Sequence, residues 1–340
     1  MLKRALFICS ISFFLVNNQL NAQILSVKGN QFYWLGQKFP MWGIRVASAS
    51  QTDSLTNQLI GQLDDYKQNG INAVSVFVQG SSGGYCDPFL ADGTQINQDH
   101  FRRLTQIIEA CQSRSMVVIV GIFYQRAMQG SNPLRNINDS LAVFHAVETV
   151  AKKLIPYRNV IFNIANEQNS SLYRSFKPLN FNDPKNIINL CKHVKNADPE
   201  RIVGGGGYND TSNVAIGKSA YVDVLLFDTF SEDVQKGEHS GWHYDYFRKM
   251  GVPDKPIINV EIFGSWTAQF IPPGVFPEEG KKIHLQEITE SRKRPGLYVH
   301  FHSNVWLQGI SAGYPVRFEL GGMGILQDPG IRWWFNALNK

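Results

Sequence analysis

Short apolar runs alternate with amphipathic stretches along most of this 340-residue chain. Eight runs resemble buried strands: residues 41–46, 71–78, 116–123, 160–165, 201–206, 222–227, 256–262 and 296–302. After most runs, apolar residues recur at intervals of three and four, as at Leu55, Leu59 and Leu63, which predicts a helix. Continuous apolar strands that alternate with helices are typical of a parallel sheet covered on its outside.

Eight such units predict an α/β fold, a (β/α)8 TIM barrel in a single domain. An open, doubly wound sheet is the alternative that the same alternation permits. Residues 24–40 carry the turn residues Gly29 and Asn30, and they predict a short N-terminal β-hairpin that plugs the bottom of the barrel. Residues 331–338 predict a closing helix.

The first 22 residues have the pattern of a secretory signal peptide. Lys3 and Arg4 give a basic start, residues 5–16 are apolar and uncharged, and Ala22 supplies a small residue at a cleavage point. The apolar run is too short to span a bilayer; an anchor that stays attached is the alternative. We therefore expect a barrel domain over residues 23–340, periplasmic or secreted, with no membrane contact after cleavage.

Charge and cysteine content exclude several classes of function. Removal of residues 1–22 takes away two of the 33 basic residues and none of the 28 acidic ones, so the net charge becomes +3. That value gives no argument for nucleic acid. Cys86, Cys111 and Cys191 remain; their spacing suggests no metal site, and their odd number allows at most one disulfide within the chain. Cys111 and Cys191 fall on apolar helix faces, which favours core positions.

Polar and aromatic side chains stand where the apolar runs end, and in a barrel the active site lies at that end of the strands. Aromatic residues there suggest sugar binding, because pyranose rings stack on aromatic faces. The substrate-binding candidates are Arg45, Gln79, Tyr124, Asn166, Asn209, Asp228, Trp266, His302 and Trp306.

Two carboxylates, Glu167 and Glu261, are the catalytic candidates. They end the fourth and seventh runs, 94 residues and about three βα units apart, so they face each other across the barrel mouth. Two convergent carboxylates are the equipment of glycoside hydrolysis: one attacks the anomeric carbon, and the other gives a proton to the leaving oxygen. Repulsion between nearby carboxylates raises one pKa, which keeps the acid protonated.

Each of these residues also has a purely structural interpretation. Glu167 and Glu261 are each open to pairing with a structural arginine, and Asp228 is open to capping a helix. Residues 204–207, all glycine, lack the Lys-Ser/Thr of a phosphate-binding loop. Small residues that let a strand end pass under a sugar are the better interpretation.

At these residues the chain resembles a clan A glycoside hydrolase, close to the cellulase-like family 5. NVIFNIANEQ (159–168) is similar to that family's fourth-strand signature, and KPIINVEIFG (255–264) to its seventh. The resemblance implies that Glu167 is the acid/base, that Glu261 is the nucleophile, and that Asn166 donates to the sugar 2-OH. It also implies that Trp306 is the sugar platform and that the mechanism is retaining double displacement.

Several residues depart from that family's pattern. Ser75 stands on the second strand where the family usually has an arginine close to the nucleophile, and Arg45 on the first strand is the candidate to supply that charge. Asp228, Thr229 and Phe230 replace a His-x-Tyr on the sixth strand. The catalytic pair is therefore kept while its surroundings are rebuilt, which suggests a divergent member and speaks against cellulose as the substrate.

The sequence thus predicts a retaining β-glycosidase that acts on a polysaccharide or its oligosaccharides. It predicts no cofactor and no metal, because two carboxylates supply both the proton and the covalent intermediate. A barrel that binds carbohydrate without cleaving it is the alternative, because the surroundings of the pair are rebuilt. The sequence leaves open endo against exo action, the sugar, its linkage and the oligomeric state.

Overall fold

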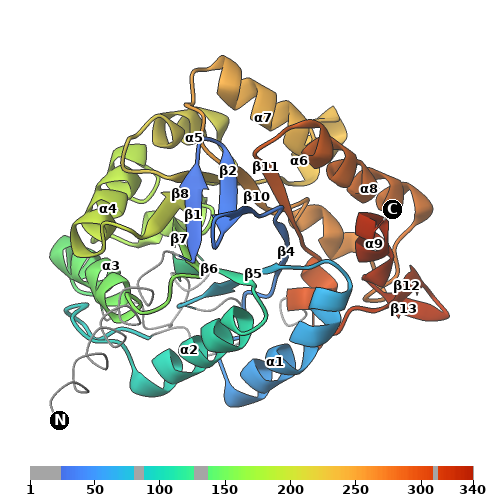
Figure 1. The fold of residues 1–340 in the computed structure, drawn as a ribbon, viewed down its shortest axis with the longest axis horizontal. Helices are drawn as coiled ribbons and strands as arrows, with labels where there is room; N and C mark the ends of the chain where they lie inside the picture. Colours follow the sequence, from blue (N-terminus) through green and yellow to red (C-terminus); the bar gives the residue numbers. More distant parts are fainter. Residues whose placement is uncertain (1–23, 80–87, 126–136, 309–312, 340) are drawn as a thin grey trace, which may run out of the picture.

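The chain folds into a closed barrel of eight parallel strands (Figure 1). The computed structural model describes residues 24–79, 88–125, 137–308 and 313–339. The strands are β4 (Trp42–Arg45), β5 (Ala73–Phe77), β6 (Val117–Phe123), β7 (Val160–Ala165), β8 (Ile202–Gly205), β9 (Val224–Asp228), β10 (Ile257–Glu261) and β11 (Leu297–Phe301). Each pairs with the next in the chain, and β11 closes the ring on β4 through Val299 and Trp42. This closure confirms the barrel and excludes the open sheet.

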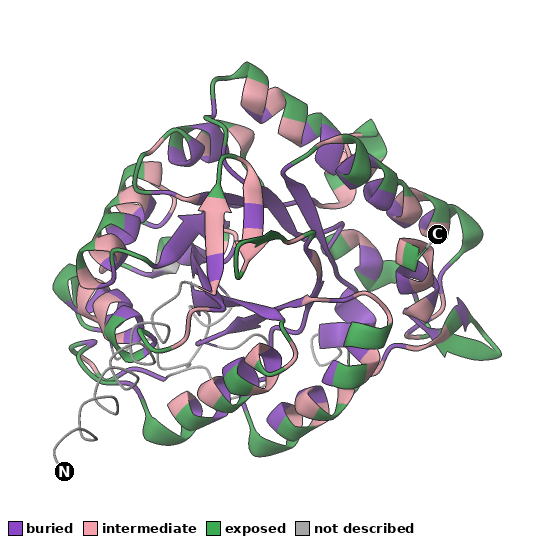
Figure 2. Cartoon of the chain, in the orientation of Figure 1, coloured by how far each residue is buried: buried purple, intermediate pink, exposed green. Residues whose placement is uncertain are grey.

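Helices surround the strands, and their outer faces are exposed while the strands are buried (Figures 1 and 2). They are α1 (Asp53–Gln68), α2 (Gln98–Gln112), α3 (Ser140–Lys153), α4 (Pro184–Ala197), α5 (Asp210–Gly217), α6 (Ser231–Lys236), α7 (Ser240–Lys249), α8 (Glu278–Lys293) and α9 (Arg332–Asn336). Side-chain caps start several of them, as Thr52 does by accepting from Leu55 N. The predicted closing helix appears as α9 and a short 3-10 turn over Ala337–Asn339.

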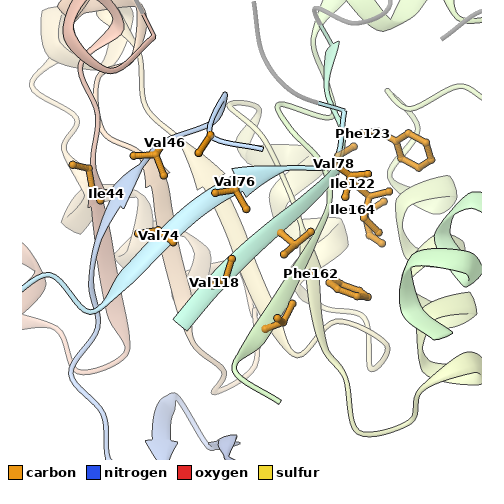
Figure 3. Close-up of a cluster of buried hydrophobic side chains, with 14 of the residues drawn as sticks. Ile44, Val46, Val74, Val76, Val78, Val118, Ile122, Phe123, Phe162 and Ile164 are labelled. Carbon is orange, nitrogen blue, oxygen red and sulfur yellow. The ribbon is translucent and has the colours of Figure 1, made fainter. Parts of the chain in front are cut away.

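The largest apolar cluster lies between the barrel strands and the helices. Figure 3 shows part of it, with Val74 and Val76 on β5 and Phe162 on β7. These side chains are fully buried. Strand side chains alternate between two faces, so the other face of the same strands fills the inside of the barrel.

The N-terminal hairpin covers one end of the barrel, as Figure 1 shows. It consists of β1 (Leu25–Lys28), β2 (Gln31–Trp34) and the short β3 (Gln37–Lys38). Leu25 and Phe32 are buried in a second apolar cluster with strand residues such as Ile119 and Ile258. The predicted plug is therefore confirmed, and it closes the end opposite to the carboxyl ends of the strands.

Some features were outside the prediction. A small hairpin of β12 (Gly321–Ile325) and β13 (Asp328–Gly330) precedes α9. Cys111 and Cys191 are buried free thiols, which confirms their core positions. Cys86 and the predicted signal peptide lie outside the described residues. No helix in the described ranges is both long and apolar enough to cross a bilayer.

Candidate active site

Glu167 stands just past the end of β7 in a sharp change of chain direction. Its φ is +44°, a left-handed conformation that is uncommon for a residue with a side chain. Ser170 N donates to Glu167 O at 2.7 Å and closes the turn. Such conformations cost free energy and cluster at functional sites. The turn leaves the Glu167 side chain partly exposed, whereas its neighbour Asn166 is fully buried.

Glu261 reaches the barrel mouth through a local irregularity in β10. Ile258 and Val260 belong to the apolar cluster inside the barrel, and Asn259 donates outward to Ser240 of α7. Simple alternation would place Glu261 on the face of Asn259, away from the interior. The register against β9 shifts between Asn259 and Glu261, and a bulge of this kind re-aims a side chain. Gly264 makes room, because a Cβ there would lie 1.8 Å from Glu261 Oε1.

Arg45, at the end of β4, connects the two glutamates. Its Nη1 forms an ion pair with Glu261 Oε2 and donates to Asn166 Oδ1 at 2.9 Å. Asn166 Nδ2 in turn lies 3.2 Å from Glu167 Oε1, to which it donates. A continuous chain of polar contacts therefore joins Glu167 to Glu261. Ser75 on β5, the position where the family resemblance implies an arginine, pairs in register with Arg45.

The Arg45 guanidinium is fully buried and stays charged. Burial alone would lower its pKa, but the carboxylate of Glu261, then Tyr124 and Asp228, raise the pKa above its usual value. The guanidinium also lies over the rings of Phe77 and Tyr124, 5.0 and 5.8 Å from their centroids. A buried cation with these partners supplies a fixed positive charge next to Glu261.

Asp228 is the third carboxyl group of the site. It ends β9, pairs in register with Glu261, and its Oδ1 lies 3.9 Å from Arg45 Nη1. Burial, followed by the charges of Glu261 and Glu167, raises the pKa of Asp228 well above its usual range, and Arg45 only partly offsets this. These surroundings favour the protonated form of Asp228 more than water would favour that of an exposed carboxyl group. It caps no helix, because α6 begins at Ser231 with Phe230 as its N-cap.

Amide and phenol groups hold this cluster from the β5 and β6 side. Tyr124 N donates to Gln79 Oε1 at 2.9 Å, and Asn166 Nδ2 donates to Gln125 Oε1 at 2.9 Å. The Tyr124 hydroxyl accepts from Arg45 Nη2 and from Gln308 Nε2, both at 3.4 Å. The side chains of Gln79, Tyr124, Gln125 and Gln308 are all buried. Tyr124 therefore supports Arg45 directly, and Gln79 holds the backbone of Tyr124.

His302 follows β11 and is fully buried, with Nε2 3.6 Å from Glu261 Oε1. The structure therefore brings six of the predicted residues together with Glu261: Arg45, Gln79, Tyr124, Asn166, Asp228 and His302. Glu167 joins them through Asn166. His300, on β11, is a second buried histidine, and its Nδ1 lies 2.9 Å from Ser75 Oγ. Burial, and then the charge of Arg45, lowers the pKa of His300 to about 3.

Three predicted substrate-binding residues have other contacts. Asn209 caps α5 by accepting from Ser212 N at 2.9 Å. Trp266 stacks on buried His284 at 5.4 Å between centroids. Trp306 is only 4% exposed, Arg317 lies over its ring at 5.2 Å, and its Nε1 donates to Glu319 O. The structure thus buries most of the ring that the family resemblance assigned as the sugar platform, because the segment before α9 folds over it.

Among the described residues, another aromatic pair lies at the mouth: Tyr208, which is exposed, and Phe230, which is partly buried. Tyr208 follows β8, is 41% exposed, and meets Phe230 edge to face at 4.8 Å between centroids. The sequence placed both residues at strand ends, but aromatic residues are frequent there, and nothing in the sequence separated them from Trp306. Gln308 was also missed, because it lies in a π-helical turn over Asn304–Gln308 that has no sequence signal.

Within the described residues, one group has ligand atoms close enough for a metal ion: Asp233, Glu238 and His243, all within 4.8 Å. The His243 ring already lies between two carboxylates, 3.0 Å from Asp210 and 3.3 Å from Asp233. Burial lowers its pKa, but these two partners outweigh it and raise the pKa to about 9. An imidazolium held by two carboxylates accounts for the cluster without a metal.

The residues at the mouth offer a partly exposed carboxyl group, a buried carboxylate next to a fixed cation, and a buried carboxyl group with a raised pKa. Such an arrangement can hold one carboxyl group charged and another neutral at the same pH. That combination suits chemistry in which one group attacks and another transfers a proton.

Comparison with known proteins gives a family and a set of similar folds. The model of the cellulase family, glycosyl hydrolase family 5, matches residues 36–218. No curated protein sequence matches the chain. An endo-1,4-β-mannanase from Rhizomucor miehei has a TM-score of 0.62 and 16% identity, over 82% of this chain and 90% of that one. A family 5 glycoside hydrolase from Bacteroides vulgatus has a TM-score of 0.63 and 15% identity, over 95% of this chain and 69% of that one. An endo-1,4-β-mannanase from Eisenia fetida has a TM-score of 0.60 and 14% identity, over 93% of this chain and 95% of that one.

Proposed function

Because this chain belongs to glycosyl hydrolase family 5, the cellulase family, and is therefore a glycosidase, we propose that it cleaves β-glycosidic bonds of a polysaccharide by retaining double displacement. The observation that carries this proposal is the chain of contacts from Glu167 through Asn166 and Arg45 to Glu261. It gives the two carboxyl groups unequal surroundings in one site.

Glu261 is the proposed nucleophile. Its carboxylate is buried and paired with Arg45, so it is held in the charged form that attack requires. One of its oxygens forms a bond to the anomeric carbon, and the bond from that carbon to the leaving oxygen breaks. The product of this step is a glycosyl ester on Glu261.

Glu167 is the proposed acid and base. Its partly exposed side chain is open to the leaving group and to water. In the first step its proton goes to the leaving oxygen. In the second step it takes a proton from the water that attacks the glycosyl ester, and the sugar leaves with its original anomeric configuration. Asn166, already oriented by Arg45 and Gln125, is the proposed donor to the sugar 2-OH.

The raised pKa of Asp228 is compatible with this division of roles. A charged Asp228 beside Glu261 would compete for Arg45, and a protonated one leaves the guanidinium to the nucleophile. In its protonated form, Asp228 has a hydrogen-bond donor for the carboxylate or for a sugar hydroxyl. His302 is the other proposed polar contact for the sugar in the cleaved position.

The proposed substrate is a β-1,4-linked mannan, with β-1,4-glucan as the second candidate. Two of the structures reported above are named endo-1,4-β-mannanases, and the family is named for cellulases. The proposed site of action is the periplasm or the medium, after cleavage behind Ala22. Mass spectrometry of the protein recovered from those fractions should find an N-terminus at Gln23; a retained residue 1 would refute the signal peptide.

The test of the function is a polysaccharide panel of mannan, glucomannan, cellulose and xylan, read by released reducing ends. We expect release from mannan or glucan, and NMR during the reaction should show the β-anomer first. A first-formed α-anomer would refute retention. Tight binding to the panel with no release would instead favour a barrel that binds carbohydrate without cleaving it.

A further inference from the structure

Resting on the proposed function, we propose that Tyr208, supported by Phe230, is the stacking platform for the sugar on the leaving-group side of the cleaved bond. Its ligand is the apolar face of a β-1,4-linked hexopyranose. None of the sequence patterns assigned this role to either residue.

The Tyr208 ring is exposed but held in place. It is 41% exposed, whereas most of the mouth is buried. Tyr208 N donates to Asn169 Oδ1 at 3.0 Å, and the Tyr208 hydroxyl is hydrogen-bonded to the Ser170 side chain. The Phe230 ring supports it at 4.8 Å with an interplanar angle of 77°. An exposed ring held at its backbone, its hydroxyl and its edge loses little conformational freedom when a ligand stacks on it.

The platform lies on the side of Glu167. Asn169 and Ser170, which hold Tyr208, belong to the turn that directly follows Glu167. Gly207, just before Tyr208, fits against this turn because a Cβ there would lie 2.1 Å from Asn169 Oδ1. The Tyr208 phenol is within electrostatic range of both Glu167 and Asp228.

This placement selects the leaving-group side. In a retaining enzyme the acid gives its proton to the oxygen that departs with the leaving sugar, so that sugar passes next to the acid. An aromatic face beside Glu167 therefore meets the leaving sugar rather than the one that becomes attached to Glu261. Trp306 is packed under Arg317 and 4% exposed, so it offers no comparable face.

The chemistry fits a sugar because the ring is amphipathic. An aromatic face packs against the axial C–H groups of a pyranose, while the hydroxyl at its edge stays hydrogen-bonded to Ser170. Loss of such a contact is worth about tenfold in kcat/KM, the size of other favourable aromatic contacts.

The experiment compares two substrates of Tyr208→Ala. One is a pentasaccharide of the β-1,4-mannan or glucan series; the other is the matching β-glycobiosyl fluoride, whose leaving group is not a sugar. We expect about a tenfold loss of kcat/KM on the pentasaccharide and less than a twofold change on the fluoride. Tyr208→Phe should keep most of the activity. Trp242→Ala, which removes a 39% exposed ring on α7, is the matched control and should change neither.

Equal loss on both substrates, or no loss on the pentasaccharide, would overturn the platform. Calorimetric binding of the pentasaccharide to Glu261→Gln, with and without Tyr208→Ala, separates this result from a failure of the proposed function. If the wild type cleaves nothing, the proposed function fails. The platform is still supported in that case if Glu261→Gln binds the pentasaccharide and the added Tyr208→Ala substitution weakens the binding. Binding that Tyr208→Ala leaves unchanged, or no binding, overturns it.

Discussion

The two ends of the barrel are formed by the same eight strands, yet they are built from opposite kinds of side chain. At the hairpin end the interior is apolar, with Phe32 packed on Tyr298 at 5.1 Å between ring centroids. At the other end, Arg45, Asp228 and Glu261 are all buried and charged or ionisable. A few residues along each strand separate these environments.

The difference teaches where the free energy of folding comes from and where it is given up. Burial of apolar side chains at the hairpin end stabilises the fold without any need for partners. Burial of three ionisable groups at the mouth costs free energy that the Arg45–Glu261 attraction only partly returns. We infer that the hairpin end and the outer cluster carry the stability, while the mouth is kept for chemistry.

The largest effect that separates the two ends should come from Glu261→Gln. We expect kcat to fall by about 10⁴-fold or more, because no covalent intermediate can form. The unfolding temperature should change little, since Asp228 remains as a second carboxyl group 3.9 Å from Arg45. The measurements are reducing-end release and thermal unfolding on the same preparation. Turnover within tenfold of the wild type would contradict the role of Glu261.

Glu167→Gln should have the next largest effect, and it should depend on the leaving group. Turnover of an oligosaccharide should fall by about 10²- to 10⁴-fold, because the leaving oxygen receives no proton. A glycosyl fluoride needs no such proton, so formation of the glycosyl enzyme from it should be nearly unaffected. Rapid-quench kinetics with both substrates give the comparison. An equal loss on both would point to a collapsed site instead of a missing acid.

Phe32→Ala is the corresponding change at the hairpin end. Phe32 is fully buried in the inner apolar cluster, and such truncations cost about 3–5 kcal/mol of unfolding free energy. We expect that loss in urea unfolding, with kcat per folded molecule unchanged. Phe39→Ala, on a partly buried ring at the edge of the same cluster, serves as the control and should cost less. A changed kcat for Phe32→Ala would show that the two ends are coupled.

The smallest effect should come from Asp228→Asn, and it should depend on pH. The folded-state pKa of Asp228 is raised above its unfolded value near 3.8. The bound proton therefore stabilises the fold fully below that value, and this stability is lost as pH rises toward the folded pKa. Asparagine does not ionise, so the variant should gain in unfolding temperature relative to the wild type from pH 4 to pH 8. A difference that is flat across this range would mean that Asp228 is charged in the fold.

The strands and the hairpin were readable because their signals are local. Each barrel strand falls within or beside one of the eight apolar runs, and the turn at Gly29 and Asn30 appears where it was expected. Glu167 and Glu261 were found because a carboxylate directly after an apolar run is rare. The positions of both follow from strand ends alone, and their proposed roles rest on the family resemblance.

Other features of the site depend on contacts between distant segments. The bulge that turns Glu261 inward involves the pairing of β9 with β10. The burial of Trp306 involves Arg317 and Glu319, which fold back over it. No pattern near Trp306 distinguishes a covered ring from an open one, so the exposure of this residue could not be predicted from the sequence.

The sequence by itself determined the alternation of strands and helices and the end of the strands at which chemistry is expected. It predicted the barrel and the plug, but the pairing of β11 with β4 decided against an open sheet. These predictions follow from hydrophobic periodicity, which depends on residues only a few positions apart. Tertiary structure decided that Arg45, a candidate from the sequence, pairs with Glu261, that burial raises the pKa of Asp228, and that Tyr208 presents an exposed ring. Charge state and exposure depend on the distance and burial of neighbours from other strands, and one-dimensional spacing does not contain them.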